Sequence, residues 1–84
     1  MNDLDRLVRR LRGFSSRAWR TNDRSGVVRR LADDLVAIGG EGHRLPEIPD
    51  HALADVIAVV GADALAVNPA AANALLAAAL EATR

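Results

Sequence analysis

Residues 53–82 read LADVIAVVGADALAVNPAAANALLAAALEA, and this stretch decides the fold class. Its apolar residues recur at the spacing of one helix face, and the spacing continues through Gly61. Asn68 followed by Pro69 marks a helix start, because Asn caps free backbone amides and Pro fits the first turn. The stretch therefore predicts two helices, over 51–66 and 69–82. Their apolar faces hold Leu53, Val56, Ile57, Val60, Ala64 and Val67 in the first, and Leu75, Leu76, Ala79 and Leu80 in the second.

A strand is the alternative for residues 56–60, because four of these five side chains are β-branched. The chain offers no credible partner strand, so we favour the helix. Asp50, which follows Pro49, is a suitable N-cap for that helix.

Two more helices are predicted upstream, over 3–20 and 25–38. Asn2 or Asp3 can cap the first, and Asp23 or Ser25 can cap the second after a turn at 21–26. The apolar faces hold Leu4, Leu7, Val8, Leu11, Phe14 and Ala18 in the first, with Trp19 at its edge, and Val27, Val28, Leu31, Leu35 and Ile38 in the second. Gly39 and Gly40 end the second helix.

The sequence thus predicts a single all-α domain over 1–84, a bundle of about four helices with one long Gly/Pro loop at 39–50. Leu45 and Ile48 are apolar enough to pin this loop to the core. A chain of 84 residues without cysteine has a modest core and no disulfide to reinforce it. The alanine-rich segment 69–82 permits close helix approach, and we expect it to form either an internal contact or the seam of a homo-oligomer.

Charge is divided unevenly along the chain. Residues 1–30 carry nine of the eleven arginines against three acids, whereas residues 31–84 carry two arginines against eight acids. The zero net charge therefore hides a dipolar molecule, which bears on partners more than on fold. Lysine is absent, and we interpret this as the usage of a bacterial genome rich in G and C.

The arginine-rich side of segment 3–20 is the most suggestive surface. Acids at helical spacing can screen Arg6 and Arg9, namely Asp3 and Asp5. On the second helix, Arg29 and Arg30 each precede an acid by four residues, which predicts pairs with Asp33 and Asp34. The candidate partner-binding residues that remain are Arg10, Arg17, Trp19 and Arg20.

Trp19 has two interpretations. It follows the apolar stripe, which favours a place in the core, but an exposed Trp would be a natural interface anchor.

Two functional hypotheses follow. The first is a non-enzymatic protein-protein interaction or assembly module that self-associates. The basic helix predicted over 3–20 would attract the acids Asp50, Asp55 and Asp63 of another copy. The alternative is a small nucleic-acid-binding regulator whose arginines follow a phosphate backbone. A basic amphipathic helix could also lie on an anionic membrane, although the core needs the same apolar stripe.

Enzyme chemistry is poorly supported. The serines lack a positioned base, and no glycine run matches a phosphate-binding loop. His43 and His51, with Glu41 and Glu47 nearby in sequence, match no metal-site spacing. We therefore expect no catalytic residue, no metal, no cofactor and no small-molecule substrate. With no transmembrane segment and no apolar secretory signal, the expected location is cytoplasmic.

Overall fold

The computed structural model describes residues 2–40 and 47–84, and these fold as the all-α bundle that the sequence predicts. Its helices are α1 (Asp3–Arg12), α2 (Ser16–Arg20), α3 (Arg24–Gly39), α4 (Leu53–Val67) and α5 (Pro69–Ala82). Two single-turn 3-10 helices precede α3 and α4, namely η1 (Thr21–Asp23) and η2 (Asp50–Ala52). Residues 56–60 lie within α4, so the strand alternative is wrong.

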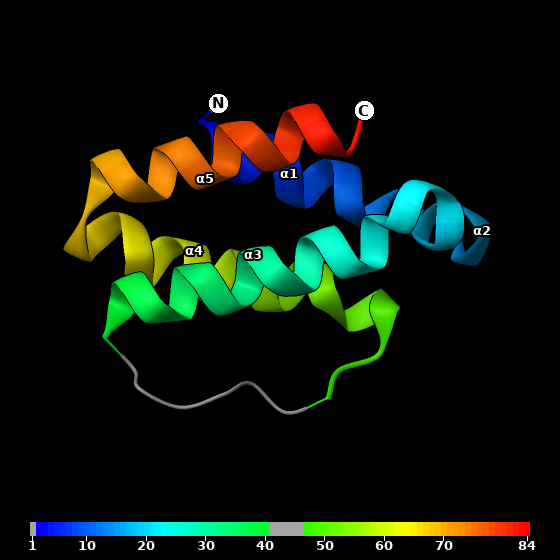
Figure 1. Ribbon diagram of the computed structural model, residues 1–84, viewed down its shortest axis with the longest axis horizontal. Coiled ribbons are helices and arrows are strands. Elements are labelled where there is room, and N and C mark those ends of the chain that lie inside the picture. The colour runs from blue at the N-terminus through cyan, green and yellow to red at the C-terminus, as the bar shows by residue number, and fades with distance from the viewer. Residues whose placement is uncertain (1, 41–46) are drawn as a thin grey trace.

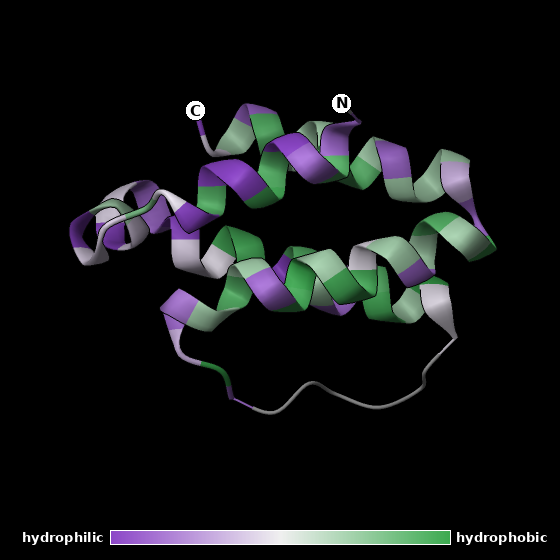
Figure 2. Ribbon diagram, turned by 180° about the vertical axis from the view of Figure 1, so that it is seen from behind, coloured by the Kyte–Doolittle hydropathy of each residue, from purple (hydrophilic) through white to green (hydrophobic). Residues whose placement is uncertain are grey.

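The four longer helices form two layers (Figure 1). Both α1 and α3 pack against α4 and α5, so α1 and α3 occupy opposite corners of the bundle. The side shown in Figure 1 presents α3 and α5, and the reverse side in Figure 2 presents α1 and α4. The short helix α2 lies at one end, against the start of α3.

The core joins the predicted apolar faces. The buried large side chains include Leu4, Leu7, Val8, Leu11, Trp19, Val28, Leu31, Leu35, Leu53, Ile57 and Leu76. Val67 was expected on the apolar face of α4 but is 62% exposed, because it lies at the turn into α5, where the core ends. Ile48 packs against the core as predicted, whereas Leu45 lies outside the described residues.

The single helix predicted over 3–20 is wrong, because the structure divides it at Gly13 into α1 and α2. Glycine has a low helix propensity, and Ser15 offers a new N-cap by accepting a hydrogen bond from the Ala18 amide at 3.1 Å. The break lets α2 turn back, so that the rings of Phe14 and Trp19 meet in a T-shaped contact at a centroid distance of 5.0 Å.

Helix ends follow the sequence in three places. Asn2 caps α1 by accepting from the Asp5 amide at 2.8 Å, and Asn68 caps α5 by accepting from the Ala71 amide at 3.2 Å. Gly40 ends α3 in the left-handed conformation at φ 76°.

Two predicted caps fail. Neither Asp23 nor Ser25 forms a side-chain cap on α3, and Asp50 forms none on η2 or α4. Their side chains instead form contacts described below. Asn22 and Asp23 both take left-handed backbone, which Asn and Asp tolerate better than other non-glycine residues.

Candidate interaction surfaces

The four candidate partner-binding residues lie in different surroundings. Arg17 and Arg20 are exposed on α2, whereas Arg10 is half-buried and Trp19 is 3% exposed. The structure therefore brings only Arg17 and Arg20 to one open surface.

Trp19 belongs to the core, as the favoured interpretation of the sequence predicts. Its ring packs at 83° to that of Phe14, and the guanidinium carbon of Arg24 lies 5.2 Å from the Phe14 centroid. Arg24 also donates to the carbonyls of Ala18 and Arg84, at 3.3 and 2.9 Å. This stack joins α2 to α3 and to the end of α5, so Trp19 stabilises the fold and is not free to anchor a partner.

Arg10 also differs from its expected place on an open basic face. Its Nη1 donates to the Leu80 carbonyl at 2.6 Å and to Thr83 Oγ1 at 3.3 Å. Thr83 is buried, and its hydroxyl donates in turn to the Ala79 carbonyl at 2.7 Å. The last turn of a helix leaves carbonyls without partners and carries partial negative charge, so a guanidinium is favoured there. Arg10 therefore fastens α1 to the end of α5.

We expect Arg10→Ala to lower the free energy of unfolding by about 1–2 kcal/mol, because it removes charged hydrogen bonds to half-buried acceptors. Urea unfolding of the variant measures this loss. Arg17→Ala, which removes an exposed arginine, is the matched control and should change stability little. Equal stability of the two variants would contradict the role of Arg10.

Acids neutralise much of the remaining basic surface. Arg6 pairs with Asp3 at 3.6 Å, as predicted. Arg12 reaches Asp55 on α4 at 3.0 Å. The pairs predicted for Arg29 and Arg30 within α3 are wrong, because each arginine meets an acid outside its own helix. Arg29 lies 2.9 Å from Asp50, and Arg30 lies 3.7 Å from Asp23.

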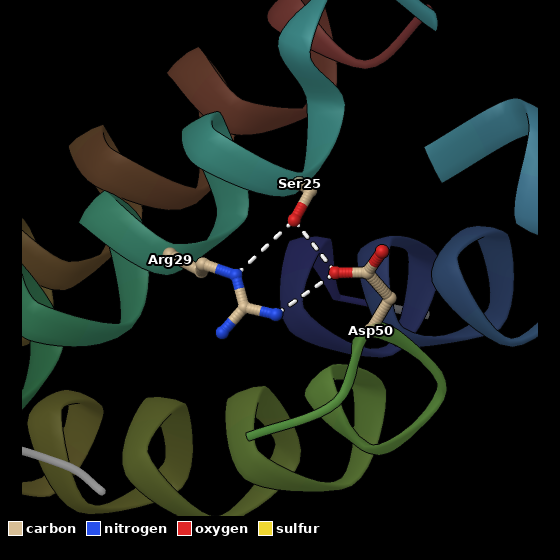
Figure 3. Close-up of polar contacts among 3 residues, drawn as sticks. All are labelled: Ser25, Arg29 and Asp50. Atoms are coloured by element: carbon tan, nitrogen blue, oxygen red, sulfur yellow. Dashed lines mark hydrogen bonds and ion pairs between the residues drawn. The ribbon is translucent and has the colours of Figure 1, made fainter. Parts of the chain in front are cut away.

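Ser25, Arg29 and Asp50 form a closed polar cluster between α3 and η2 (Figure 3). The Ser25 hydroxyl donates to Asp50 Oδ1 at 2.6 Å, and Arg29 donates through Nη2 to the same oxygen at 2.9 Å. Arg29 Nε donates to Ser25 Oγ at 3.1 Å. The cluster clamps the start of α3 to the turn that precedes α4.

The hydrogen bond from Ser25 and then that from Arg29 hold the pKa of the Asp50 carboxyl below its ordinary value of 3.8, although burial opposes them. A carboxylate with a lowered pKa is a weak base, and the guanidinium has no lone pair to offer. The arrangement therefore suits a structural clamp and leaves Ser25 without an activating base within the cluster.

Asp50→Asn should lower the free energy of unfolding by up to about 1 kcal/mol at neutral pH, because the Arg29–Asp50 pair is about one-third exposed and screened by water. The folded pKa lies below the unfolded one, so ionised Asp50 stabilises the fold above pH 3.8. This contribution is lost as pH falls through the folded pKa. Urea unfolding across the acid range should show wild type and variant converging, with Asp33→Asn as control; a constant difference would contradict the clamp.

Of the two histidines, the structure describes His51. It is exposed in η2, and the carboxylate of Asp55, four residues further along the chain, pairs with Arg12. His43 and Glu41 lie outside the described residues. Within residues 2–40 and 47–84, no three acids or histidines gather as a metal-ion ligand set. In the same part of the chain, no helix is long and apolar enough to cross a bilayer.

Two shallow grooves lie on opposite sides of the bundle. The larger, of about 600 Å³, runs between α1 and α4 on the side shown in Figure 2. Its lining consists of Leu4, Asp5, Val8, Arg9, Arg12, Ala58 and Ala62. The smaller, of about 210 Å³, runs between α3 and α5. Small alanine side chains on α4 and α5 leave this space beside the larger residues of α1 and α3.

The outward sides of α4 and α5, which lie at opposite corners of the bundle, both expose apolar residues. Val59 and Val67 on α4 are 63% and 62% exposed, and they are the exposed large apolar residues of this part of the chain. Five alanines of α5 are also exposed, namely Ala70, Ala74, Ala77, Ala78 and Ala82.

Comparison with known proteins finds no family, no curated protein and no solved structure that matches this chain.

Two structural contacts were missed by the sequence analysis. Gly61 lies where a Cβ atom would come within 2.6 Å of Leu4 Cδ1, so its lack of a side chain lets α1 approach α4. Its position on the buried face of an otherwise alanine-rich helix could have indicated this. Thr83 gave no such signal, because nothing in its local sequence indicates burial beneath Arg10.

Proposed function

We propose that this chain is a non-enzymatic helical module that acts by associating with further copies of itself. The observation that carries the proposal is the set of apolar side chains exposed on the outward sides of α4 and α5, namely Val59 and Val67 on α4 and the five exposed alanines of α5. A surface helix normally presents charged or polar residues to water, and a helix that is apolar on all sides is normally covered. A second copy would supply that cover.

The size of the chain supports the same conclusion. A domain of 84 residues has little core, and α5 contributes mostly alanine, which buries little apolar area per residue. Association stabilises the folded state in proportion to the logarithm of the partner concentration. A self-associating chain would therefore gain stability that its own core does not supply.

Sedimentation equilibrium tests this proposal directly. The weight-average mass should rise above that of one chain as concentration increases towards about 1 mM, where an association worth about 4 kcal/mol is half complete. The single-chain mass at every concentration would overturn the proposal. High salt alone should not abolish an association that depends on apolar contact.

Fewer arginines are free to contact nucleic acid than the sequence suggests. Arg9, Arg17 and Arg20 are exposed and form no ion pair with any residue in the described ranges. These three could still contact phosphates, whereas Arg6, Arg10 and Arg12 have partners within the fold.

A gel shift at low salt tests this alternative. Binding through two phosphate contacts on α2 should weaken as salt rises, with a log–log slope of about −2, and the double change Arg17→Ala and Arg20→Ala should abolish it in any base sequence. An absence of retardation at low salt would exclude the alternative.

A further inference from the structure

We infer that the self-association surface is the α1–α4 side of the bundle, where two copies pair about a two-fold axis with their α1 helices antiparallel. This inference rests on the proposed self-association, and of the two apolar sides named there it uses the one on α4. Asp5, Arg9 and Val59 carry it.

Asp5 and Arg9 form a pair of opposite charges that the fold leaves open. They are four residues apart on α1, both are exposed, and both line the α1–α4 groove. The intrahelical ion pair expected from their spacing does not form, and neither meets another charged group within salt-bridge distance in the described chain. Each therefore keeps an unneutralised charge beside an apolar groove floor made by Leu4, Val8 and Ala58.

The order of these charges is complementary to itself. A second α1 that runs antiparallel, centred between residues 5 and 9, places Asp5 of each copy opposite Arg9 of the other. The two contacts are equivalent, as a two-fold interface requires. A parallel arrangement in the same register would place like charges together, so the charge pattern selects the antiparallel one.

The same axis brings Val59 towards its own copy. Helices α1 and α4 run in opposite directions side by side (Figure 2), with Arg12 bonded to Asp55 and Leu4 against Gly61. Val59 lies between Asp55 and Gly61 in α4, and so beside the part of α1 between Arg12 and Leu4. A two-fold axis across both helices at this level therefore sets Val59 near Val59 of the partner copy, covering one of the two large apolar side chains exposed in the described chain.

The outer side of α5 offers less to fix such an arrangement. Its charged residue Glu81 already lies 3.5 Å from Arg84, and the alanines beside it carry no feature that sets a register. We therefore assign the first contact between copies to α1 and α4.

Charge reversal tests the pairing. Arg9→Asp alone, or Asp5→Arg alone, creates two like-charge contacts and should raise the dimer dissociation constant at least about tenfold. The double variant, Asp5→Arg with Arg9→Asp, restores both contacts in reversed sense and should restore dimerisation. Arg17→Asp, an equal change of charge on α2, is the control and should leave the dissociation constant unchanged.

Cysteine cross-linking provides a second measurement that does not depend on the charges. The chain has no cysteine, so Val59→Cys introduces a unique thiol. A disulfide requires Cα atoms within about 7 Å, so oxidation should trap the Val59→Cys dimer. Val67→Cys lies at an equally exposed position near the turn into α5, and oxidation of this variant should give only background cross-linking.

The outcomes separate the two proposals. If wild type dimerises but neither single reversal weakens it, or if Val67→Cys cross-links as well as Val59→Cys, the α1–α4 pairing is wrong and self-association through another face stands. If wild type sediments as a single chain throughout, the proposed function fails as well. Loss of dimer in both single variants with recovery in the double variant supports the pairing. Helix content by circular dichroism confirms that each variant is folded.

Discussion

Trp19→Ala should lower the free energy of unfolding by about 3–5 kcal/mol, the usual cost of emptying a buried aromatic site. The ring is 3% exposed, and its loss also removes the edge-to-face contact with Phe14. Because Phe14 in turn supports Arg24, the junction between α2, α3 and the end of α5 should loosen together. For a domain of ordinary stability this is a large fraction of the total.

Urea unfolding, followed by circular dichroism because the variant lacks the tryptophan, measures this change. Arg20→Ala on the same short helix removes an exposed side chain and should alter stability by no more than about 0.5 kcal/mol. If Trp19→Ala unfolded like this control, Trp19 would have no core role, and its docking role would have to be reconsidered.

Gly61→Val is expected to destabilise the fold by about 2–3 kcal/mol, because it overpacks the contact between α4 and α1. Even a Cβ atom at this position would lie 2.6 Å from Leu4 Cδ1 and 3.3 Å from Leu4 Cδ2. Valine adds two further methyl groups in the same confined space, so Leu4 or α1 itself must move.

Two companion variants isolate the cause. In Gly61→Ala, the gain in helix propensity over glycine, about 1 kcal/mol, should offset much of the cost of shifting the flexible end of Leu4. Combining Gly61→Val with Leu4→Ala removes the side chain that the valine meets, so the double variant should lose less stability than the two single changes added together. Thermal or urea unfolding of the four proteins completes the cycle, and strict additivity would show that the two positions do not meet.

Local signals predicted the helices well because each signal resides in a few neighbouring residues. Asn68 and Pro69 begin α5 as expected, and Gly40 ends α3. The failure within 3–20 has a local cause: Gly13 weakens the helix where Ser15 can cap a new one. The apolar periodicity continued across this break and concealed it.

The candidate surface was predicted less well because arginine partners come from other helices. Sequence spacing predicted that Arg29 pairs with Asp33. In the folded chain Arg29 instead binds Asp50, which lies 21 residues further along the sequence. Arg10 was expected to face water, but the carbonyls of the last turn of α5 lie beside it. A guanidinium on a long flexible chain takes the best acceptor within reach, and that choice depends on packing.

The sequence by itself determined that this chain is helical, where most of its helices begin and end, and which faces are apolar, because capping and periodicity act over one or two turns. Tertiary structure alone decided which arginines remain exposed without a partner and which bind residues of α4, α5 or η2. It also decided that Gly61 lets α1 approach α4 closely, and that Asp5 and Arg9 stay unpaired beside the α1–α4 groove. These outcomes depend on distances between helices, and such distances are fixed only when the whole core packs.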